Sequence, residues 1–157
     1  GDYPVEERVD FSHKTLTSER GVRFNEMEYH LPREAAPDVL REIIKTIETN
    51  NIRVFFPIEF RTVAADDIWL SPFYGRKSAS IAVHQFHEWD YHDYFAAVEA
   101  IHKKHEGRPH WGKINTLRAK DFAALYPKWN DFLKIRKELD PTGKFLTPYM
   151  KDVFGVA

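Results

Sequence analysis

Two residues that stand two apart have types suited to binding a polar substrate. They are Glu59 and Arg61, in the segment PIEFR at residues 57–61. Residues at this spacing on a strand share a face, about 7 Å apart along the backbone. An acid and a cation side by side on a rigid strand would orient a polyhydroxyl compound. The alternative is a solvated ion pair of little energetic consequence, and spacing by itself favours this alternative because such pairs are common.

A second chemical grouping lies in the segment RPHWGK at residues 108–113. Proline and glycine restrict this backbone, while His110, Trp111 and Lys113 crowd into four positions, so the segment would place a cation with little freedom. Lys113 would then stabilise negative charge that develops on a cofactor or an oxyanion. The alternative is a turn between a helix and a strand, in which Trp111 anchors in the core and Lys113 is solvated. The residues by themselves leave both interpretations open.

Four further histidines form two His-x-x-His pairs, a spacing that occurs in metal sites. His84 and His87 would point to opposite faces of a strand, which disfavours joint chelation. His102 and His105 would lie on adjacent ridges of a helix, but no cysteine or clear carboxylate partner completes a ligand set. We therefore expect surface or core histidines and no metal site, with a metal-dependent hydrolase as the alternative.

Composition restricts the class of protein. The chain has 157 residues, which suits one domain with a core, and its net charge of −1 argues against nucleic-acid binding through phosphate neutralisation. It has no cysteine, which excludes disulfides and zinc-thiolate sites. The absence of cysteine does not identify the compartment, but it fits the cytoplasmic location that we expect. No apolar run has the length of a membrane span. The sequence has no glycine-rich phosphate loop, so we expect no nucleotide cofactor to bind unaided.

The elements that would position these residues follow from apolar periodicity. Alternation predicts strands over 22–31, 52–63 and 79–87, and helical spacing predicts helices over 36–49 and 92–106. Gly107 is expected to be a left-handed helix cap, and residues 1–21 an extended leading segment. The rest is expected to be a loop over 66–77, a short helix over 121–126, a helix from Pro127 and a turn at 140–143. This order predicts the α+β class: an antiparallel sheet with helices packed on one face, followed by a helical C-terminal tail.

Several predicted core stripes can be stated by residue. The stripes are Val54, Phe56, Ile58 and Phe60 on the second strand, Leu40, Ile43, Ile44 and Ile47 on the first helix, and Phe95, Val98, Ile101 and His102 on the second helix. Pro57 lacks a ladder donor and marks an edge or a bulge.

Four segments, in order along the chain, together resemble one protein family. They are EMEYHLPRE at 26–34, PIEFR at 57–61, the run from Val83-His84 to RPHWGK at 108–113, and LDPTGKF at 139–145 with Tyr149. The chain resembles the C-terminal region of the aldonolactone oxidoreductases, which include D-arabinono-1,4-lactone oxidase, L-gulonolactone oxidase or dehydrogenase, and alditol oxidase. These proteins belong to the vanillyl-alcohol-oxidase flavoprotein superfamily. The resemblance extends from about Val22 over nearly the whole chain.

The resemblance implies that residues 1–157 form the substrate (cap) domain of an FAD-linked oxidoreductase. A C-terminal stretch would pack on an FAD-binding domain that this chain lacks, and the fragment alone would be inactive. Glu59, Arg61, His84 and His110 would bind a sugar lactone or polyol, and Arg61 would help to deprotonate the reacting hydroxyl. Lys113, with His110, would contact the FAD and stabilise the charge of the reduced flavin. The reaction would be hydride transfer from a hydroxyl-bearing carbon to the flavin.

Departures from the family pattern bear on the substrate. Asn115 and Thr147 differ from the residues common in relatives, and Gln85-Phe86 after His84 differs from the His-Phe-Thr of alditol oxidases. This favours a 1,4-lactone of the D-arabinono or L-gulono type over a linear polyol. An alditol oxidase cap domain and a stand-alone, non-catalytic binding module remain as alternatives. Peripheral membrane association of the full-length protein is the alternative to a purely cytoplasmic location.

Overall fold

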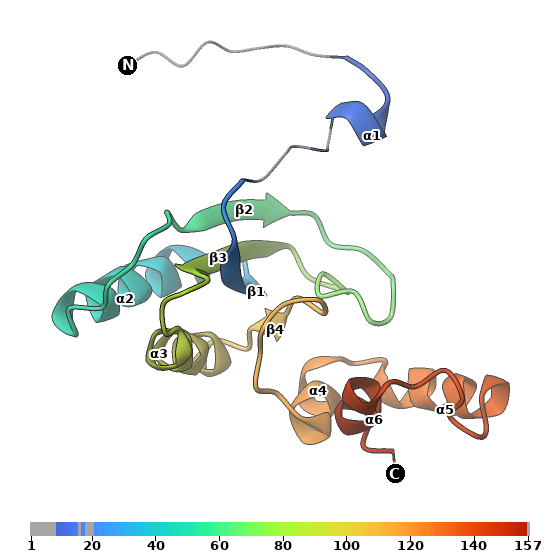
Figure 1. Cartoon of the computed structure of the whole chain (residues 1–157). Coiled ribbons are helices and arrows are strands. Elements are labelled where there is room, and N and C mark those ends of the chain that lie inside the picture. The colour runs from blue at the N-terminus through green and yellow to red at the C-terminus, as the bar shows by residue number, and fades with distance from the viewer. Residues whose placement is uncertain (1–8, 16, 18–20, 157) are drawn as a thin grey trace.

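A four-stranded antiparallel sheet with helices on one face organises the chain. The structure is a computed structural model, and it describes residues 9–15, 17 and 21–156. The strands follow the spatial order β2-β3-β1-β4, with bounds β1 Phe24–Pro32, β2 Glu59–Val63, β3 Ser78–Phe86 and β4 Arg108–Pro109 (Figure 1). Helices α2 (Ala36–Thr49) and α3 (His92–Lys104) lie against one face. This confirms the predicted α+β class.

Three short helices follow the sheet and confirm the predicted helical tail. They are α4 (Ala119–Leu125), α5 (Trp129–Leu139) and α6 (Pro148–Phe154), and they gather beyond β4 (Figure 1). The predicted leading segment over 1–21 lies largely outside the described residues, and its described part contains the helical turn α1 (Ser12–Thr15). Within the described residues no helix is long and apolar enough to cross a membrane.

Alternation along β1 and β3 gives the sheet two different faces. The helix-covered face presents Met27, Tyr29 and Leu31 of β1 with Ile81 and Val83 of β3, none of them more than 1% exposed. These side chains pack with Val39 and Ile43 of α2 and Phe95 and Val98 of α3. The other face, which we call the polar face, presents Glu26, Glu28 and His30 of β1, Ser80, Ala82 and His84 of β3, and Glu59, Arg61 and Val63 of β2.

Helix α2 has the predicted bounds, and its buried stripe is rotated from the predicted one. Val39 and Ile43 are fully buried, whereas Ile44, which was predicted to be core, is 41% exposed. The stripe expected on α3 is confirmed, since Phe95, Val98, Ile101 and His102 are all buried. The prediction that Gly107 is a left-handed cap is wrong, because Glu106 adopts the positive φ of 55°.

Gly107 is instead required by a close approach. A Cβ built on Gly107 would lie 2.8 Å from the backbone oxygen of His102 and 3.0 Å from Cδ1 of Tyr29. Its amide donates to that same His102 oxygen at 2.9 Å. Only a residue without a Cβ lets the chain leave α3 this closely and enter β4.

Strand β2 is shorter than predicted, because residues 52–58 do not join the ladder. Pro57 has no amide hydrogen to donate, and the backbone oxygen of Arg53 is satisfied instead by the side-chain amide of Gln85 at 2.8 Å. Phe60 was predicted to be core and is 42% exposed, because β2 is the edge strand of the sheet. The pairing of β2 with β3 begins at Glu59, opposite Ala82.

The β2–β3 connection over 64–77, predicted as a loop, is tied to the segment after α3. The buried guanidinium of Arg108 donates to the backbone oxygens of Pro72 at 3.2 Å and Tyr74 at 2.9 Å. The indole of Trp111 donates to the oxygen of Leu70 at 2.8 Å. Two loops that are distant in the sequence are therefore held together beside the polar face.

The C-terminal helices pack through an aromatic cluster that includes this tryptophan. Trp111 stacks on Phe122 of α4 with ring centroids 5.0 Å apart, and Phe122 stacks on Trp129 of α5 at 5.7 Å. Helix α6, which the sequence did not predict as a helix, begins after Thr147, whose hydroxyl accepts from the amide of Met150 at 3.2 Å. The cluster anchors the RPHWGK segment to a rigid support.

Candidate functional site

Small residues on the middle strand create a depression in the polar face. Strand β3 lies between β1 and β2, and its register places Ala82 between Glu28 and Glu59. The next row places Ser80 between His30 and Arg61. Since strands are about 4.8 Å apart, long side chains from the two outer strands can meet above the short ones. A cavity of about 430 Å³ lies here, with Glu28, His30, Arg61, Pro72, Phe73, Ser80, His110, Trp111 and Lys113 among its lining residues.

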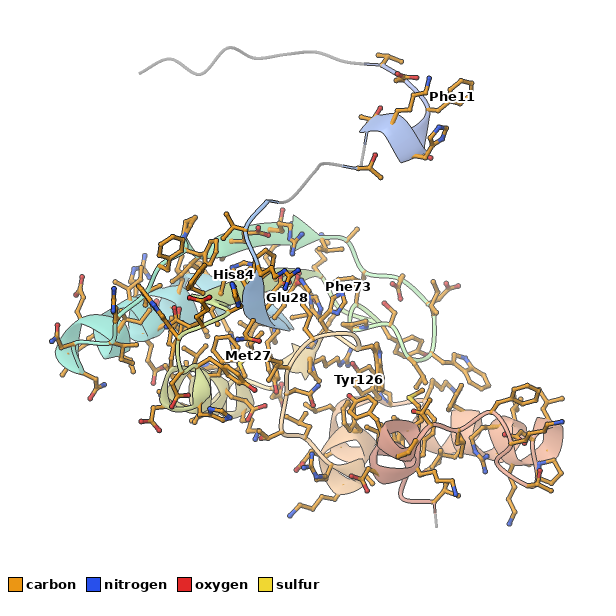
Figure 2. The ribbon with its side chains drawn as sticks, viewed as in Figure 1. Phe11, Met27, Glu28, Phe73, His84 and Tyr126 are labelled. Carbon is orange, nitrogen blue, oxygen red and sulfur yellow. The ribbon has the colours of Figure 1, made fainter. Side chains whose placement is uncertain are left out.

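One buried carboxylate contacts two cations from different elements. Glu28, whose side chain is 3% exposed, accepts through Oε1 from the guanidinium of Arg61 at 2.8 Å. Its Oε2 accepts from Nζ of Lys113. Glu28 lies at the centre of the sheet, on the side away from the helices (Figure 2). Arg61 and Lys113 are therefore brought to one carboxylate.

A second glutamate extends the cluster towards a histidine. Glu26 accepts from Lys113 through the same Oε1 that lies 3.1 Å from Nε2 of His84. His84 is 5% exposed, and its Nδ1 is buried without a hydrogen-bond partner among the described residues. The rings of Phe24 and His84 meet edge to face at 5.0 Å. Glu26 thus orients the His84 ring relative to Lys113.

Lys113 reaches the cluster because its loop is fixed at both ends to β1. The amide of His110 donates to the backbone oxygen of Glu28 at 3.0 Å, and the amide of Ile114 donates to that of Glu26 at 3.0 Å. Between these bonds the chain turns, with the Lys113 amide donating to the His110 oxygen at 3.2 Å. The ammonium therefore projects over the two glutamates, and the Lys113 side chain is only 19% exposed.

His30 is a neutral group beside the cluster. Burial lowers its pKa to about 4, against the opposing effect of Glu28. Its Nδ1 is hydrogen-bonded to the hydroxyl of Ser80 at 2.7 Å, while its Nε2 is buried without a partner among the described residues. The His110 ring lies 6.0 Å away. An imidazole of this kind accepts or donates a hydrogen bond without adding charge.

The electrostatics of the cluster are dominated by paired charges. Burial raises the pKa of Glu28, but the hydrogen bond from Lys113 and the charges of Lys113 and Arg61 outweigh it, so the pKa of Glu28 lies below its ordinary value. Glu28 is therefore ionised at neutral pH. The cluster therefore sets the carboxyl groups of Glu26, Glu28 and Glu59 against the cationic side chains of Lys113 and Arg61.

For the Glu59–Arg61 pair and for the RPHWGK segment, the structure agrees in part with each of the two interpretations. Glu59 and Arg61 form the expected same-face pair, but at 3.6 Å with side chains 43% and 53% exposed, while the closer partner of Arg61 is Glu28. In the RPHWGK segment, Trp111 does anchor in the core, yet Lys113 is paired and not solvated. His84 and His110 lie at the same face, so all five predicted site residues are brought together.

Sequence reasoning missed the residues that join this set. Glu26, Glu28, His30 and Ser80 hold or flank the predicted residues, and Glu28, His30 and Ser80 line the depression. A signal was present, because three titratable residues alternate with Met27, Tyr29 and Leu31 along one strand. A strand with one apolar face and three titratable residues on the other is a candidate site in itself.

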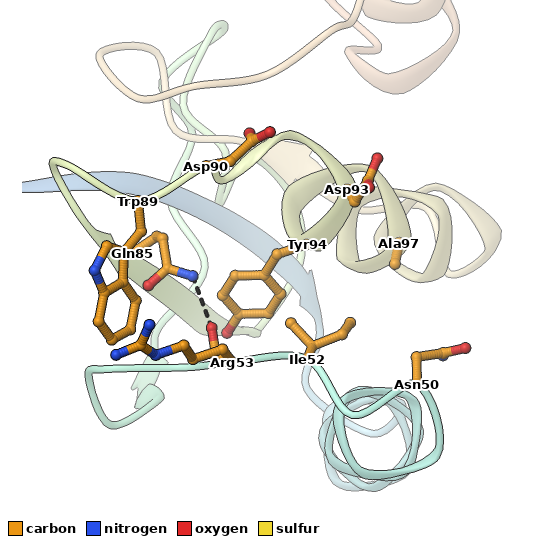
Figure 3. A pocket seen from close by; sticks show the side chains of 9 residues that line it. All are labelled: Asn50, Ile52, Arg53, Gln85, Trp89, Asp90, Asp93, Tyr94 and Ala97. Atoms are coloured by element: carbon orange, nitrogen blue, oxygen red, sulfur yellow. Dashed lines mark hydrogen bonds between the residues drawn. The ribbon is translucent and has the colours of Figure 1, made fainter.

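A larger cleft of about 720 Å³ lies on the helix-covered side, between the end of α2 and the start of α3 (Figure 3). Its lining includes Gln85, whose side-chain amide donates to the backbone oxygen of Arg53. The guanidinium of Arg53 lies over the Trp89 ring, 3.5 Å from its centroid. Gln85 therefore points away from the polar face, so its departure from the family pattern does not alter contacts in the cluster.

The histidines do not assemble a metal site in the part of the chain that is described. No group of three or more His, Cys, Asp or Glu residues there has the geometry to hold a metal ion. Both nitrogens of His102 are buried without a partner, and its ring stacks on Tyr29 at 4.8 Å. His105 instead pairs with Glu42 at 3.3 Å. Each of these two histidines has a structural environment of its own.

The donor set on the polar face is suited to a polar ligand that carries hydroxyl groups. Lys113 supplies a cation, the half-exposed Arg61 supplies a guanidinium, and His110 supplies an imidazole beside the depression. The aromatic rings of Phe73 and Trp111 belong to its walls. Lys113 and His110, which line the depression, have the side chains that would contact a cofactor bound at this face.

The chain is similar to known proteins over most of its length. The family model of D-arabinono-1,4-lactone oxidase matches residues 2–153. The chain is 41% identical over 146 residues to the L-gulono-1,4-lactone dehydrogenase of Mycobacterium tuberculosis, covering 93% of this chain and 34% of that protein. It is 36% identical over 153 residues to the L-gulonolactone oxidase of Bos taurus, covering 94% of this chain and 35% of that protein. It is 33% identical over 153 residues to the alditol oxidase of a Streptomyces species, covering 96% of this chain and 36% of that protein.

These relatives are lactone or alditol oxidoreductases by name, and the chain spans about one third of their length. The family match includes the RPHWGK segment and the strand that carries Glu59 and Arg61. The chain belongs to the D-arabinono-1,4-lactone oxidase family.

Proposed function

We propose that this chain is the substrate-side part of an FAD-dependent oxidoreductase that oxidises a sugar-derived 1,4-lactone of the D-arabinono or L-gulono type. One observation carries the proposal: in a chain of this family, Arg61 and Lys113 line one depression of the sheet and share the carboxylate of Glu28, and Glu59 lies 3.6 Å from Arg61. The remaining part of the protein would hold the FAD and would pack against this chain. Residues 1–157 would form a single substrate (cap) domain in a cytoplasmic protein.

The exposed groups of the cluster would bind and orient the substrate. Arg61 and Glu59 are half exposed, so a guanidinium donor and a carboxylate acceptor are available to adjacent hydroxyl groups. A guanidinium stays protonated in proteins, so Arg61 would not take a proton itself. Its charge would lower the pKa of a bound hydroxyl and favour transfer of the proton to a neighbouring acceptor.

The buried groups would stabilise charge and accept a proton. Lys113 would lie over the reacting centre and stabilise negative charge there. His84, which Glu26 orients, would accept the proton, and neutral His30 would contribute a hydrogen bond without a change of charge. The flavin, when bound, supplies the hydride acceptor.

The test uses the full-length protein that contains this chain, purified with FAD under anaerobic conditions. L-Gulono-1,4-lactone or D-arabinono-1,4-lactone should bleach the flavin absorbance faster than xylitol or sorbitol. Faster bleaching by the alditols would favour the alditol oxidase alternative, and no bleaching by either class would contradict both. The 157-residue chain alone should be colourless and inactive, and a yellow preparation would contradict the assignment of FAD binding to another part.

Two substitutions test the assigned residues in the same assay. Arg61→Ala and Lys113→Ala should each slow flavin reduction about 100-fold or more, the size of effect seen when one charge-stabilising donor is lost. Arg41→Ala is the control, because Arg41 pairs with Asp38 on the outside of α2 and is 73% exposed. Near-normal reduction in either site variant would remove that residue from the site.

A further inference from the structure

A single carboxylate connects the two candidate catalytic cations. Glu28 binds Arg61 with one oxygen and Lys113 with the other, and these partners lie 33 and 85 residues away in the sequence. We propose that Glu28 is a positioning residue that fixes the Arg61 guanidinium and the Lys113 ammonium relative to each other. The proposal deepens and rests on the proposed function of the same site.

The neighbouring glutamates do not have the contacts for this role. Glu26 pairs with Lys113 and His84 but has no contact with Arg61. Glu59 is 3.6 Å from Arg61, with a half-exposed side chain, and it makes no contact with Lys113. Glu28 alone among the described acids contacts both cations, and it does so from a side chain that is 3% exposed.

The place of Glu28 is itself fixed by the sheet. Glu28 lies in a central strand opposite Ala82, and its backbone oxygen accepts from the His110 amide at 3.0 Å. The nearby His30, 4.0 Å away, is neutral at physiological pH and does not compete with the cations for the carboxylate. A charged acceptor held by a strand is a rigid reference point for long side chains.

Contact with Glu28 would preorganise the Arg61 and Lys113 side chains for substrate binding. Lysine and arginine side chains lose rotamer entropy when they become fixed, so binding a substrate with mobile side chains is less favourable than binding it with fixed ones. Arg61 and Lys113 come from an edge strand and from a loop, and neither element by itself holds its charged end in place. By binding both, Glu28 would ensure that a substrate meets two donors already aimed at it, which preserves the rate of the chemical step.

Four variants separate positioning from simple stability. Glu28→Met removes both acceptor oxygens, whereas Glu28→Gln keeps one oxygen for Arg61 and presents an amide to Lys113. Glu26→Met removes the other partner of Lys113 but leaves Arg61 its carboxylate. Glu99→Gln is the matched control, because Glu99 is also buried, at 4% side-chain exposure, and contacts neither cation.

The first readout is the order of the side chains in the 157-residue chain, from ¹⁵N relaxation of Arg61 Nε and ¹³C relaxation of Lys113 Cε. Glu28→Met should lower the order parameter of Arg61 Nε–H from above about 0.7 to below about 0.5, the range of flexible groups. Glu28→Gln should be intermediate, and Glu26→Met and Glu99→Gln should leave Arg61 unchanged. An Arg61 as ordered in Glu28→Met as in the wild type would overturn the proposal.

The second readout is flavin reduction in the full-length, FAD-loaded protein. Glu28→Met should lower the maximal reduction rate at least 10-fold, with partial recovery in Glu28→Gln and none of the loss in Glu99→Gln. An unchanged rate in Glu28→Met would overturn the positioning role. If the wild type is reduced by neither lactones nor alditols, the proposed function fails, while the relaxation measurement still decides whether Glu28 holds the two cations.

Discussion

Replacing Lys113 with methionine should destabilise the chain in a way that depends on pH. Lys113 is the partner of two glutamates, and one of them, Glu28, is 3% exposed. Removing one partner of a buried charge pair leaves the other charge uncompensated, which costs about 3–5 kcal/mol. Arg61 still contacts Glu28 at 2.8 Å, so part of the charge stays balanced. We therefore expect a loss of about 2–3 kcal/mol in the free energy of unfolding at pH 8.

The pH dependence provides the sharper test. In the wild type, the pKa of Glu28 is below its ordinary value, so its contribution to stability is present above the unfolded-state pKa and is lost as the pH falls. Burial is the largest influence on this group and acts to raise its pKa. Without Lys113, burial should dominate and place the folded pKa above the unfolded one. The deficit of the variant should then shrink as the pH falls from 8 to 5.

The assay is urea unfolding followed by tryptophan fluorescence at pH 5, 6, 7 and 8. Lys104→Met is the control, because Lys104 pairs with Glu42 on the surface at 63% side-chain exposure, and such pairs contribute about 0–1 kcal/mol. The reasoning is refuted if Lys113→Met unfolds within about 0.5 kcal/mol of the wild type at pH 8. It is also refuted if the deficit grows as the pH falls.

Two further substitutions test the packing beneath the site. Burial lowers the pKa of His102 to about 3, so the unfolded state binds more protons and the free energy of unfolding falls as the pH drops below about 6.5. His102→Phe should therefore reduce the loss of stability between pH 7 and pH 4 by about 3 kcal/mol. An unchanged acid-unfolding midpoint in this variant would contradict the prediction. Gly107→Ala should cost about 1–3 kcal/mol in thermal or urea unfolding, because its Cβ would meet the His102 backbone oxygen at 2.8 Å. Gly21→Ala, where a Cβ would meet nothing within 4 Å, is the control, and equal stabilities of the two alanine variants would refute the steric argument.

The local elements were predictable because each depends on neighbouring residues. Apolar spacing gave α2 its bounds, and alternation placed β1 and β3 to within about two residues. The limit of this reasoning shows at β2, where alternation continued through 52–58 but these residues do not join the ladder with β3, because Pro57 lacks an amide hydrogen and the Arg53 oxygen is bound by the Gln85 side chain. Alternation reports which side chains share a face, and it does not report whether the backbone finds a ladder.

The sequence by itself determined which residues are candidates for chemistry, because Glu59, Arg61 and Lys113 have distinctive types in distinctive segments. Only the tertiary structure decided how they are paired. Arg61 lies closer to Glu28 than to its sequence neighbour Glu59, because the short side chains of β3 leave space for contact across the sheet. Lys113 joined the same carboxylate because two backbone hydrogen bonds fix its loop to β1. Charges pair with the nearest well-placed partner in space, and the sheet register and the loop anchor set which partner that is.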